Sequence, residues 1–546
     1  MRCTRVIYFL FLDRDLDRRR MMTSEDDAID IRARHRARHR IASLLIASRL
    51  RHSTSSVMKS NASSSSSSTS RVASQRAKMR TRERARRRAA RRRDASATAT
   101  AIGQNPRVVV LGGGFGGLYT ALKLAKRARE SERAIDVVLC DRASAFAFKP
   151  LLYELVNETM GRAEVAPSYD DLVRGTGVEF VRGDVVRFDV EDGRVGYDGE
   201  DVSAFGGVVT LRDGTTLAYD YLVLALGAST SDGGVDGAKA NAIALNTAED
   251  AEAIARALNA FERDGKKARV AVVGGGLAGV ELAAVVAERL RASPAGGSVD
   301  MITPNSRVMT TSPPGQRAAA MKVLNNAAVN VVDGRVVRLD RIEAKGVDAA
   351  TATATKIILN DANGEEGEQM YDLVCWTVGQ RAVTPSDWPL PMTATRKVKT
   401  DATLRVYGHS RIYAVGDASS SAADLIDTNF EVLPSTAQVA FQQADYAAWN
   451  IWAAINGRPA LPFRYQHIGD MMVLGARDAA VALPVGDVTI DGPAAAALRR
   501  LAYLYRMPTD EHRMKVAQRW IEDGVQDFAR DPAAFLARLP NPFASL

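Results

Sequence analysis

The 546-residue sequence is poor in the residues that build disulfide scaffolds and metal sites. It has three cysteines, Cys3, Cys140 and Cys375, and six histidines, and they form neither a C-x-x-C pair nor a metal-ligand spacing. The sequence therefore argues against a disulfide scaffold and a metal site, and it lacks a dithiol for electron transfer. It also has no run of about 18 apolar residues, so we expect no membrane-spanning helix.

Acidic residues are also unevenly distributed. Residues 1–100 hold 26 Lys and Arg but only 9 Asp and Glu, so the rest of the chain carries a net charge of −8 although the total is +9. The basic pI is thus a property of the N-terminal region, and we predict no nucleic-acid partner for the folded part. At this length we expect more than one domain, because single cores rarely exceed about 300 residues.

The N-terminal leader has the composition of a targeting sequence. From Met58 on it is rich in Ser, Ala and Arg and contains two acidic residues, Glu83 and Asp94. Organelle transit peptides share this composition, and so little apolar content predicts disorder. Serine content favours a plastid over a mitochondrion. The alternatives are a nucleic-acid-binding arm or upstream sequence before a true start at Met58.

A short apolar strand and a glycine-rich loop open the remaining chain. Residues 107–111 are typical of a strand buried on both faces, and Gly112, Gly114 and Gly117 follow with G-x-G-x-x-G spacing. The first glycine permits a tight turn, the second lets backbone approach a pyrophosphate, and the third lets helix pack on strand. Residues from Leu118 on predict that helix, whose N-terminus would offer N–H groups to phosphates.

An acidic residue closes the next predicted strand. Asp141 ends residues 135–141, near the ~20-residue distance at which a carboxylate holds a ribose hydroxyl in such units. Strand, loop, helix and carboxylate together predict a dinucleotide site.

The same fingerprint occurs a second time. Residues 269–284 align with residues 107–122 without a gap, and glycines recur at Gly274, Gly276 and Gly279. Two complete fingerprints predict two dinucleotide-binding domains of Rossmann type.

The second unit differs at the end of its second strand. The strand ends at Thr303 instead of an acidic residue, and Arg307 follows closely. An uncharged strand end with a nearby arginine can accept a 2′-phosphate. We therefore expect this site to take NADPH at least as well as NADH; alternatively, Thr303 is only a strand-end residue and Arg307 a solvated one.

Each nucleotide-binding unit contains a predicted β-meander. The first covers residues 178–223 and ends on a buried strand before Gly227, and the second begins at residue 330 and ends in residues 372–378 and Gly379. The two units therefore agree beyond their glycine loops.

A further strand ends in a carboxylate. Residues 411–415 are followed by Gly416 and Asp417, which places the carboxylate at the carboxyl edge of a parallel sheet, where ligands bind.

These features together resemble the two-dinucleotide-binding flavoprotein oxidoreductases. Residues 434–445, with an A-Q-x-x-x-Q pattern, and residues 463–469 and 474–475 resemble the type II NAD(P)H:quinone oxidoreductases within that group. Residues 501–512 resemble the plastid branch of plants and algae, which acts on prenylated quinones. The resemblance covers about residues 104–523.

The resemblance implies a division of labour between the two loops. The first would hold FAD and the second NADPH or NADH, with Asp141 on the adenosine ribose of FAD and Asp417 on its ribityl or pyrophosphate side. Without a cysteine pair, electrons would leave the flavin directly for a membrane-embedded quinone. The expected cofactor-binding residues are Gly112, Gly114, Gly116, Gly117, Asp141, Lys149, Gly227, Gly416, Asp417, Ala437, Gly274, Gly276, Gly279, Thr303, Arg307 and Gly379.

The A-Q-x-x-x-Q pattern lies on a predicted helix. Residues 434–455 predict one helix with Pro434 at its start, and Gln438, Gln442 and Asp445 fall on one stripe. Neutral amides can donate a hydrogen bond to a quinone carbonyl without placing a charge there. We predict a catalytic role for Gln438 and Gln442; the alternative is a solvent-facing stripe.

A third catalytic residue is predicted at Glu281, two residues after Gly279. We expect it in the first turn of the second nucleotide-binding helix, where the helix dipole would stabilise a carboxylate. The resemblance implies a place near flavin and quinone and a role in proton handling.

The C-terminal residues predict basic amphipathic helices. Arg499, Arg500 and Arg506 fall outside the apolar face of the first helix. The apolar positions are Leu498, Leu501 and Tyr505 before Pro508, and Met514, Ala517, Trp520 and Ile521 after it. Such helices can lie in a membrane interface; the alternative is docking on the protein's own core or on a partner in a homodimer.

We therefore predict an α/β protein with two Rossmann-like domains and a C-terminal amphipathic helical segment. The expected segments are a disordered leader (1–103), a discontinuous FAD-binding domain (104–235 and 381–465), an NAD(P)H-binding domain (236–380) and a membrane-interface segment (466–546).

The expected function is non-proton-pumping quinone reduction, peripheral to a plastid thylakoid or plastoglobule surface, with the mitochondrion as alternative. A ferredoxin-type reductase would need a basic docking patch on an acidic folded part. A flavin-bearing sensor or scaffold would act through the basic arm.

Overall fold

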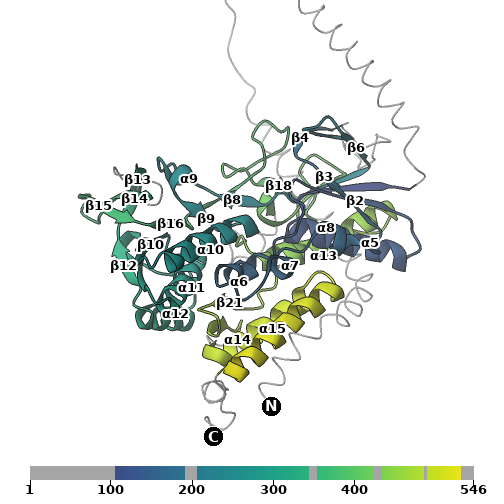
Figure 1. Ribbon diagram of the computed structural model, residues 1–546. Helices are drawn as coiled ribbons and strands as arrows, with labels where there is room; N and C mark the ends of the chain where they lie inside the picture. Colours follow the sequence, from purple (N-terminus) through teal and green to yellow (C-terminus); the bar gives the residue numbers. More distant parts are fainter. Residues whose placement is uncertain (1–104, 191–205, 344–352, 422–432, 485–487, 531–546) are drawn as a thin grey trace, which may run out of the picture. The chain divides into compact units, whose positions relative to one another are not determined.

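The computed structural model describes residues 105–190, 206–343, 353–421, 433–484 and 488–530 (Figure 1). These described residues belong to one compact unit. The predictions made for the leader, residues 1–103, lie outside the described residues. The predicted domain boundaries stay a prediction.

The first glycine loop follows the central strand of a five-stranded parallel sheet, at the carboxyl ends of its strands. The strand order is β19-β7-β1-β2-β3. The central strand β1 is buried along nearly its whole length, as its apolar composition predicts. The strands are β1 (Arg107–Leu111), β2 (Asp136–Asp141), β3 (Val178–Arg182), β7 (Tyr221–Leu224) and β19 (Ile412–Ala414).

A second parallel sheet repeats this order in four of its five strands. It runs β12-β11-β10-β16-β9, so in both sheets the glycine-loop strand is central and the strand after the meander is its neighbour. The strands are β9 (Ile243–Ala244), β10 (Ala268–Val273), β11 (Gly297–Thr303), β12 (Asn330–Asp333) and β16 (Leu373–Trp376). The predicted pair of Rossmann-like units is confirmed.

Each central strand leads through its loop into a 16-residue helix, α5 (Phe115–Glu130) or α11 (Leu277–Ala292). The prediction that the first helix begins at Leu118 is wrong by three residues. The helix begins at Phe115 because Gly114 adopts the extended N-cap conformation.

Two antiparallel meanders adjoin the parallel sheets. Both are shorter than predicted, because β3 and β12 pair in parallel with β2 and β11. The meander strands are β4 (Val185–Val190), β5 (Gly207–Leu211) and β6 (Thr216–Tyr219), and β13 (Arg335–Glu343), β14 (Thr353–Asn360) and β15 (Glu366–Tyr371).

Short elements connect these parts. Strands β8 (Ala228–Thr230) and β17 (Gln380–Ala382) form an antiparallel ribbon, and β18 (Val398–Thr400) pairs with β20 (Ser419–Ser421). The connecting helices are α6 (Leu152–Val156), α7 (Arg162–Val165), α8 (Tyr169–Val173), α9 (Ala238–Asn241), α10 (Ala248–Arg263) and α12 (Pro314–Asn326), with 3₁₀ turns η1 (Lys149–Leu151), η2 (Pro304–Ser306) and η3 (Gly416–Ala418).

The C-terminal part begins with α13 (Ala437–Ile455), which packs along α5. The predicted start at Pro434 is wrong, because the Thr436 side chain caps the helix and the proline lies before the cap. A small sheet then precedes the last two helices, so residues after 466 are not all helical. These elements are β21 (Asp470–Val473), β22 (Ala479–Ala482), β23 (Thr489–Asp491), α14 (Gly492–Arg506) and α15 (Asp510–Arg530).

One apolar cluster runs through both nucleotide-binding units and the C-terminal helices. It includes Val110 and Leu118 of the first unit, Val272 of the second, Ala448 of α13 and Val516 of α15. Within the described residues, none of the helices is long and apolar enough to cross a bilayer.

Candidate active site

The first glycine loop is shaped so that a ligand can reach its middle glycine. Gly112 has φ +99°, and a Cβ there would collide with the Ala225 carbonyl. A Cβ on Gly117 would collide with the Gly112 carbonyl, where α5 packs against the loop. Gly114 faces open space. The three glycines thus provide the turn, the ligand approach and the helix packing that a dinucleotide loop needs.

The second loop has the same geometry. Gly274 has φ +118°, a Cβ on Gly279 would collide with the Gly274 carbonyl, and Gly276 faces open space. The internal repeat is therefore repeated in backbone conformation and in the space left for a ligand.

The helices after both loops leave their N-termini open. α5 and α11 have no side-chain cap and no acidic residue in the first turn. By contrast, Thr247 and Asp250 close the N-terminus of α10 with a capping box. The first turns of α5 and α11 therefore present unpaired N–H groups and a positive dipole end, which fit a pyrophosphate.

Asp141 lies at the end of β2, beside the first loop, where sequence reasoning expects it. One carboxylate oxygen accepts from the Gly113 N–H at 2.6 Å and the other from the Ala143 N–H at 2.8 Å. The carboxylate thus orients the loop.

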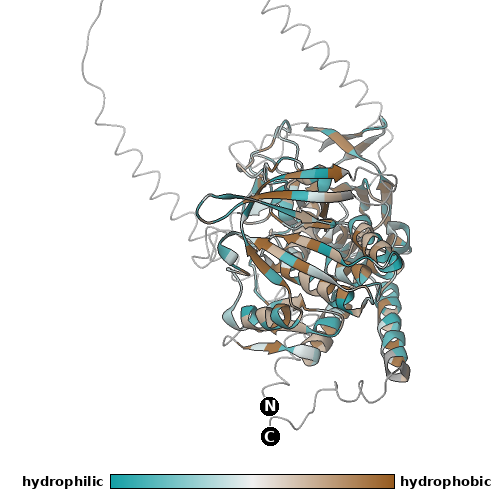
Figure 2. Ribbon diagram, turned by 60° about the vertical axis from the view of Figure 1, so that its left-hand side comes forward, coloured by the Kyte–Doolittle hydropathy of each residue, from teal (hydrophilic) through white to brown (hydrophobic). Residues whose placement is uncertain are grey.

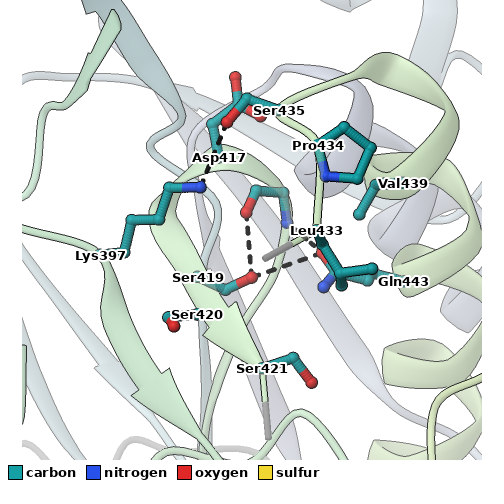
Figure 3. A pocket seen from close by; sticks show the side chains of 11 residues that line it. Lys397, Asp417, Ser419, Ser420, Ser421, Leu433, Pro434, Ser435, Val439 and Gln443 are labelled. Atoms are coloured by element: carbon teal, nitrogen blue, oxygen red, sulfur yellow. Dashed lines mark hydrogen bonds between the residues drawn. The ribbon is translucent and has the colours of Figure 1, made fainter. Parts of the chain in front are cut away.

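Gly416 and Asp417 border a pocket at the carboxyl edge of the first sheet (Figure 3). Gly416 has φ +66°, and its neighbour Val415 contacts the start of α5 so closely that a Cβ on Gly116 would lie 2.9 Å from it. The lining residues are Lys397, Gly416, Asp417, Ser419, Ser420, Ser421, Leu433, Pro434, Ser435, Val439 and Gln443.

The charges around Asp417 come from distant parts of the chain. Burial raises the pKa of Asp417, and Lys149 and Lys397 oppose that shift. Lys397 also donates to the Ser435 hydroxyl at 3.2 Å. The structure therefore brings Lys149 close enough to act on Asp417 electrostatically, whereas Ala437 begins α13 and does not line this pocket.

Gln443 is a residue that sequence reasoning missed. Its side-chain oxygen accepts from the Gly416 N–H at 2.6 Å and from the Ser419 hydroxyl at 3.4 Å (Figure 3). It is fully buried. A polar residue within the alanine-rich packing face of α13 was the available signal, because a buried amide needs a partner.

The coenzyme end of the second loop contains a carboxylate that the sequence did not suggest. The Thr303 hydroxyl donates to the Arg307 carbonyl at 3.1 Å, so Thr303 supports the loop, while the Arg307 side chain is exposed. Asp333, opposite Thr303 on β12, accepts from the Asn305 N–H at 2.5 Å. Both a cation and an anion thus lie at this edge.

Gly227 and Gly379 occupy equivalent places in the two units. Both have left-handed φ, +72° and +68°, where the chain leaves β7 or β16 for the β8–β17 ribbon. Glycine is required there because other residues rarely adopt that conformation.

Gln438 and Gln442 both bind the segment after α13. Gln438 donates to the Gly469 carbonyl at 2.9 Å and accepts from the Tyr465 hydroxyl at 2.7 Å. Gln442 donates to the Gln466 carbonyl at 2.8 Å and accepts from its N–H at 3.0 Å. The interpretation of a solvent-facing stripe is therefore wrong. Each amide binds this segment through one N–H and through its oxygen.

The stripe does not continue as one surface to Asp445. Asp445 forms an ion pair with Lys123 of α5. Asp445 thus helps to hold α13 along α5, whereas the two glutamines bind the segment after α13.

Glu281 lies in the second turn of α11, so its predicted place in the first turn is wrong. It is buried, accepts from the Val473 N–H at 2.9 Å, and hydrogen-bonds with Tyr153. Burial raises its pKa to about 7, while Tyr153, the Val473 N–H and Arg499 oppose that rise. A carboxyl group with this proton affinity can hold or release a proton near neutral pH.

Arg499 of α14 reaches the same interior. Its Nη2 donates to Glu154 Oε1 at 2.9 Å, and its Nε and Nη1 have no acceptor among the described residues. The sequence placed Arg499 outside the apolar face of this helix without indicating that it is buried, and only 2 % of its side chain is exposed. The C-terminal helices thus place a buried cation near Glu281.

Known proteins share this arrangement. The family model described as pyridine nucleotide-disulphide oxidoreductase matches residues 106–444. The Arabidopsis thaliana protein named alternative NAD(P)H-ubiquinone oxidoreductase C1, chloroplastic/mitochondrial, is 43 % identical over 78 % of this chain and 82 % of its own. Demethylphylloquinone reductase NdbB of Synechocystis is 37 % identical over 78 % of this chain and 98 % of its own.

Solved structures agree on the fold. The structure of NDH2 from Plasmodium falciparum in complex with NADH superposes with a TM-score of 0.62 at 18 % identity, covering 77 % of this chain and 98 % of that one. At this identity the likeness extends to the fold alone.

Proposed function

Because the chain belongs to the pyridine nucleotide-disulphide oxidoreductase family and, within it, to the single-subunit NAD(P)H:quinone oxidoreductases, we propose that it reduces a membrane prenylquinone with electrons from NAD(P)H. The observation that carries this proposal is the pair of open glycine cradles, each followed by an uncapped helix. One cradle serves FAD and the other the nicotinamide coenzyme. The reaction pumps no protons.

Bound FAD supplies the redox chemistry, accepting a hydride from NAD(P)H and returning two electrons to the quinone. The chain's residues bind and orient. The loop at 112–117 and the α5 N-terminus hold the FAD pyrophosphate, and Asp141 faces its ribose. Asp417 faces the ribityl side, with its charge balanced by Lys149 and Lys397.

The second cradle holds NADPH or NADH. Gly276 and the α11 N-terminus bind the coenzyme's pyrophosphate, and Arg307 provides a cation for a 2′-phosphate. Asp333 at the same edge favours a free ribose hydroxyl. With both groups present, both coenzymes are substrates, and NADPH is used at least as well as NADH.

The quinone binds beside the segment after α13, residues 465–473, which is hydrogen-bonded to both α13 and α11. Gln438 and Gln442 hold one end of this segment, and the Val473 N–H joins its other end to Glu281. The remaining amide N–H groups donate to a quinone carbonyl, and Glu281 holds or releases a proton. The quinone is a plastoquinone or a phylloquinone-precursor-like naphthoquinone.

Two C-terminal helices carry the chain to the lipid surface in which the quinone dissolves. On α14 and α15, Leu501, Met514, Ile521 and Val525 are between 52 and 69 % exposed, and apolar and polar residues alternate along α15 (Figure 2). The opposite face of α15, with His512, Val516 and Trp520, packs on the protein. The predicted stripe of Met514 and Trp520 is therefore divided, and only its exposed half meets lipid.

We place this surface in the plastid, peripheral to a thylakoid or plastoglobule membrane, with the mitochondrion as alternative. The support is the chloroplastic/mitochondrial name of the Arabidopsis relative together with the leader composition. A homodimer stays a prediction.

Stopped-flow spectroscopy of the FAD-loaded enzyme tests the function. NADPH or NADH should reduce the flavin, and a prenylquinone in detergent should reoxidise it much faster than oxygen or ferredoxin. Faster reoxidation by ferredoxin would favour the reductase alternative. Slow reoxidation by every acceptor would favour a sensor or scaffold.

A further inference from the structure

A chain of four side chains runs from the surface to Gln438. The Tyr465 hydroxyl donates to Gln438 Oε1 at 2.7 Å, and the Tyr465 oxygen lies 3.3 Å from His467 Nδ1. On the other side of the ring, His467 Nε2 lies 3.6 Å from Asp470 Oδ2. All three added residues belong to the segment that binds the glutamines of α13.

Hydrogen-bond counting gives this chain a direction. The hydroxyl of Tyr465 has one proton, and it is used on Gln438, so the tyrosine oxygen must accept from His467 Nδ1–H. The Ile468 N–H donates to the same Gln438 oxygen at 3.0 Å, which fixes that end. The His467 Nδ1–H therefore donates to Tyr465, and the Tyr465 O–H donates to Gln438 on α13.

The two ends of the chain lie in different surroundings. His467 is 36 % exposed and Asp470 is 41 % exposed, so water reaches the imidazole and the carboxylate. Tyr465 is half-buried, and burial, with a smaller contribution from the Asp470 charge, raises its pKa to about 12. The tyrosine therefore stays protonated and can act only by passing a proton on.

We propose that His467 and Tyr465 deliver a solvent proton to the quinone carbonyl bound beside Gln438, which makes Tyr465 a catalytic residue and His467 its proton source. The inference rests on the proposed function, because it requires a quinone at this place. Among the described residues, the titratable groups facing the imidazole are Tyr465 and Asp470.

The step balances with the coenzyme reaction. Forming the quinol from the quinone takes two electrons and two protons; the hydride equivalent that came from NAD(P)H supplies both electrons and one proton. The second proton comes from Tyr465, whose O–H turns from Gln438 Oε1 to the quinone oxygen as the new O–H bond of the quinol forms. His467 Nδ1–H reprotonates the tyrosine oxygen, and the imidazole, with Asp470 beside its Nε2, takes the replacement proton from water.

His467→Gln tests the inference in the FAD-loaded enzyme, since glutamine can hydrogen-bond but cannot titrate. We expect reoxidation of the flavin by quinone to slow by about 10²-fold, the usual size of a general-acid contribution. Reduction by NADPH and reoxidation by ferricyanide, which takes up no proton, should keep their rates. Quinone affinity of the oxidised enzyme should also stay within about twofold.

Two further variants distinguish a loss of proton transfer from a structural effect of the substitution. Tyr465→Phe should slow the quinone step similarly, and His467→Ala should recover on adding imidazole. His409→Gln, in the turn before β19, is the matched control and should behave as wild type.

Two results would overturn the inference: an unchanged quinone step in His467→Gln, or an equal loss with quinone and ferricyanide. A wild-type enzyme that fails to reduce any quinone would instead overturn the proposed function.

Discussion

At the scale of single residues, Glu281 shows how burial creates a titratable group near neutral pH. Desolvation outweighs a tyrosine hydrogen bond, a backbone N–H and a nearby arginine, and the pKa rises from 4.5 to about 7. The folded state therefore binds the proton more tightly than the unfolded chain. Its contribution to stability is complete below pH 4.5 and is lost as pH rises through 7.

Glu281→Gln removes this titration. Between pH 4.5 and pH 8, the wild type should lose on the order of 3 kcal/mol of unfolding free energy that the variant does not lose, because only the wild type titrates at this position. Urea unfolding of the FAD-loaded proteins at the two pH values measures it. Glu130→Gln, at an exposed position of α5, is the control. A difference that is the same at both pH values would refute the assignment.

Arg307 belongs to the same scale, because coenzyme choice depends on one exposed cation beside one carboxylate. Arg307→Ala should lower kcat/KM for NADPH by about 10-fold or more, since a charge-assisted hydrogen bond contributes about 1.5–3 kcal/mol. The value for NADH should change by less than about twofold. Arg291→Ala, exposed at the end of α11, is the control. Equal losses for both coenzymes would show that Arg307 does not contact a 2′-phosphate.

At the scale of elements, the C-terminal helices are fixed by a buried ion pair. Arg499 of α14 pairs with Glu154 of α6, and the Trp520 indole of α15 also donates to Glu154 at 3.4 Å. Three elements therefore meet at one carboxylate. Helical spacing alone assigned Arg499 to the polar face, because sequence does not reveal which basic residue has a buried partner.

Arg499→Met should cost on the order of 3–5 kcal/mol of unfolding free energy, because it leaves Glu154 buried without its cation. Combining it with Glu154→Gln should recover part of that loss. Chemical denaturation of the single and double variants measures both effects. Lys126→Met, which breaks the exposed pair with Glu130, should cost less than about 1 kcal/mol. Additive losses would mean that the two residues do not interact.

The outer face of these helices gives a second prediction at this scale. Met514→Glu with Ile521→Glu should weaken binding to plastid-lipid vesicles by at least about 100-fold, because burying each side chain contributes about 1.5–3 kcal/mol. Vesicle co-sedimentation measures the affinity, and Met370→Glu, an exposed methionine on β15, is the control. Unchanged sedimentation would indicate that this face meets protein instead of lipid.

The nucleotide-binding units and helix α13 show which elements and contacts can be predicted from sequence patterns and which cannot. The strand, loop and helix of each nucleotide-binding unit follow from glycine spacing and apolar runs, and both are confirmed. The contacts of Gln438, Gln442 and Gln443 could not be predicted, because they depend on the path of residues 465–469 and on Gly416. Without that path, the polar stripe on α13 could equally be interpreted as facing solvent.

At the scale of the whole molecule, the chain uses one unit twice. Four of the five strands have the same order in both sheets, and in both loops the middle glycine faces open space while the last packs against the first. The difference lies at the edges: β19 brings Gly416 and Asp417 to the first unit, whereas Arg307 and Asp333 lie beside the second. This asymmetry supports the proposed assignment of FAD to the first cradle and of the coenzyme to the second.

Gly276→Val tests that assignment most directly, because Gly276 faces open space and the added side chain would fill the cradle without disturbing packing. The measurement is flavin content followed by the rate of flavin bleaching with NADPH. We predict full FAD content, bleaching at least about 100-fold slower than in the wild type, and normal reoxidation by quinone after reduction with dithionite. A variant that loses FAD yet is still reduced normally by NADPH once FAD is restored would contradict the account.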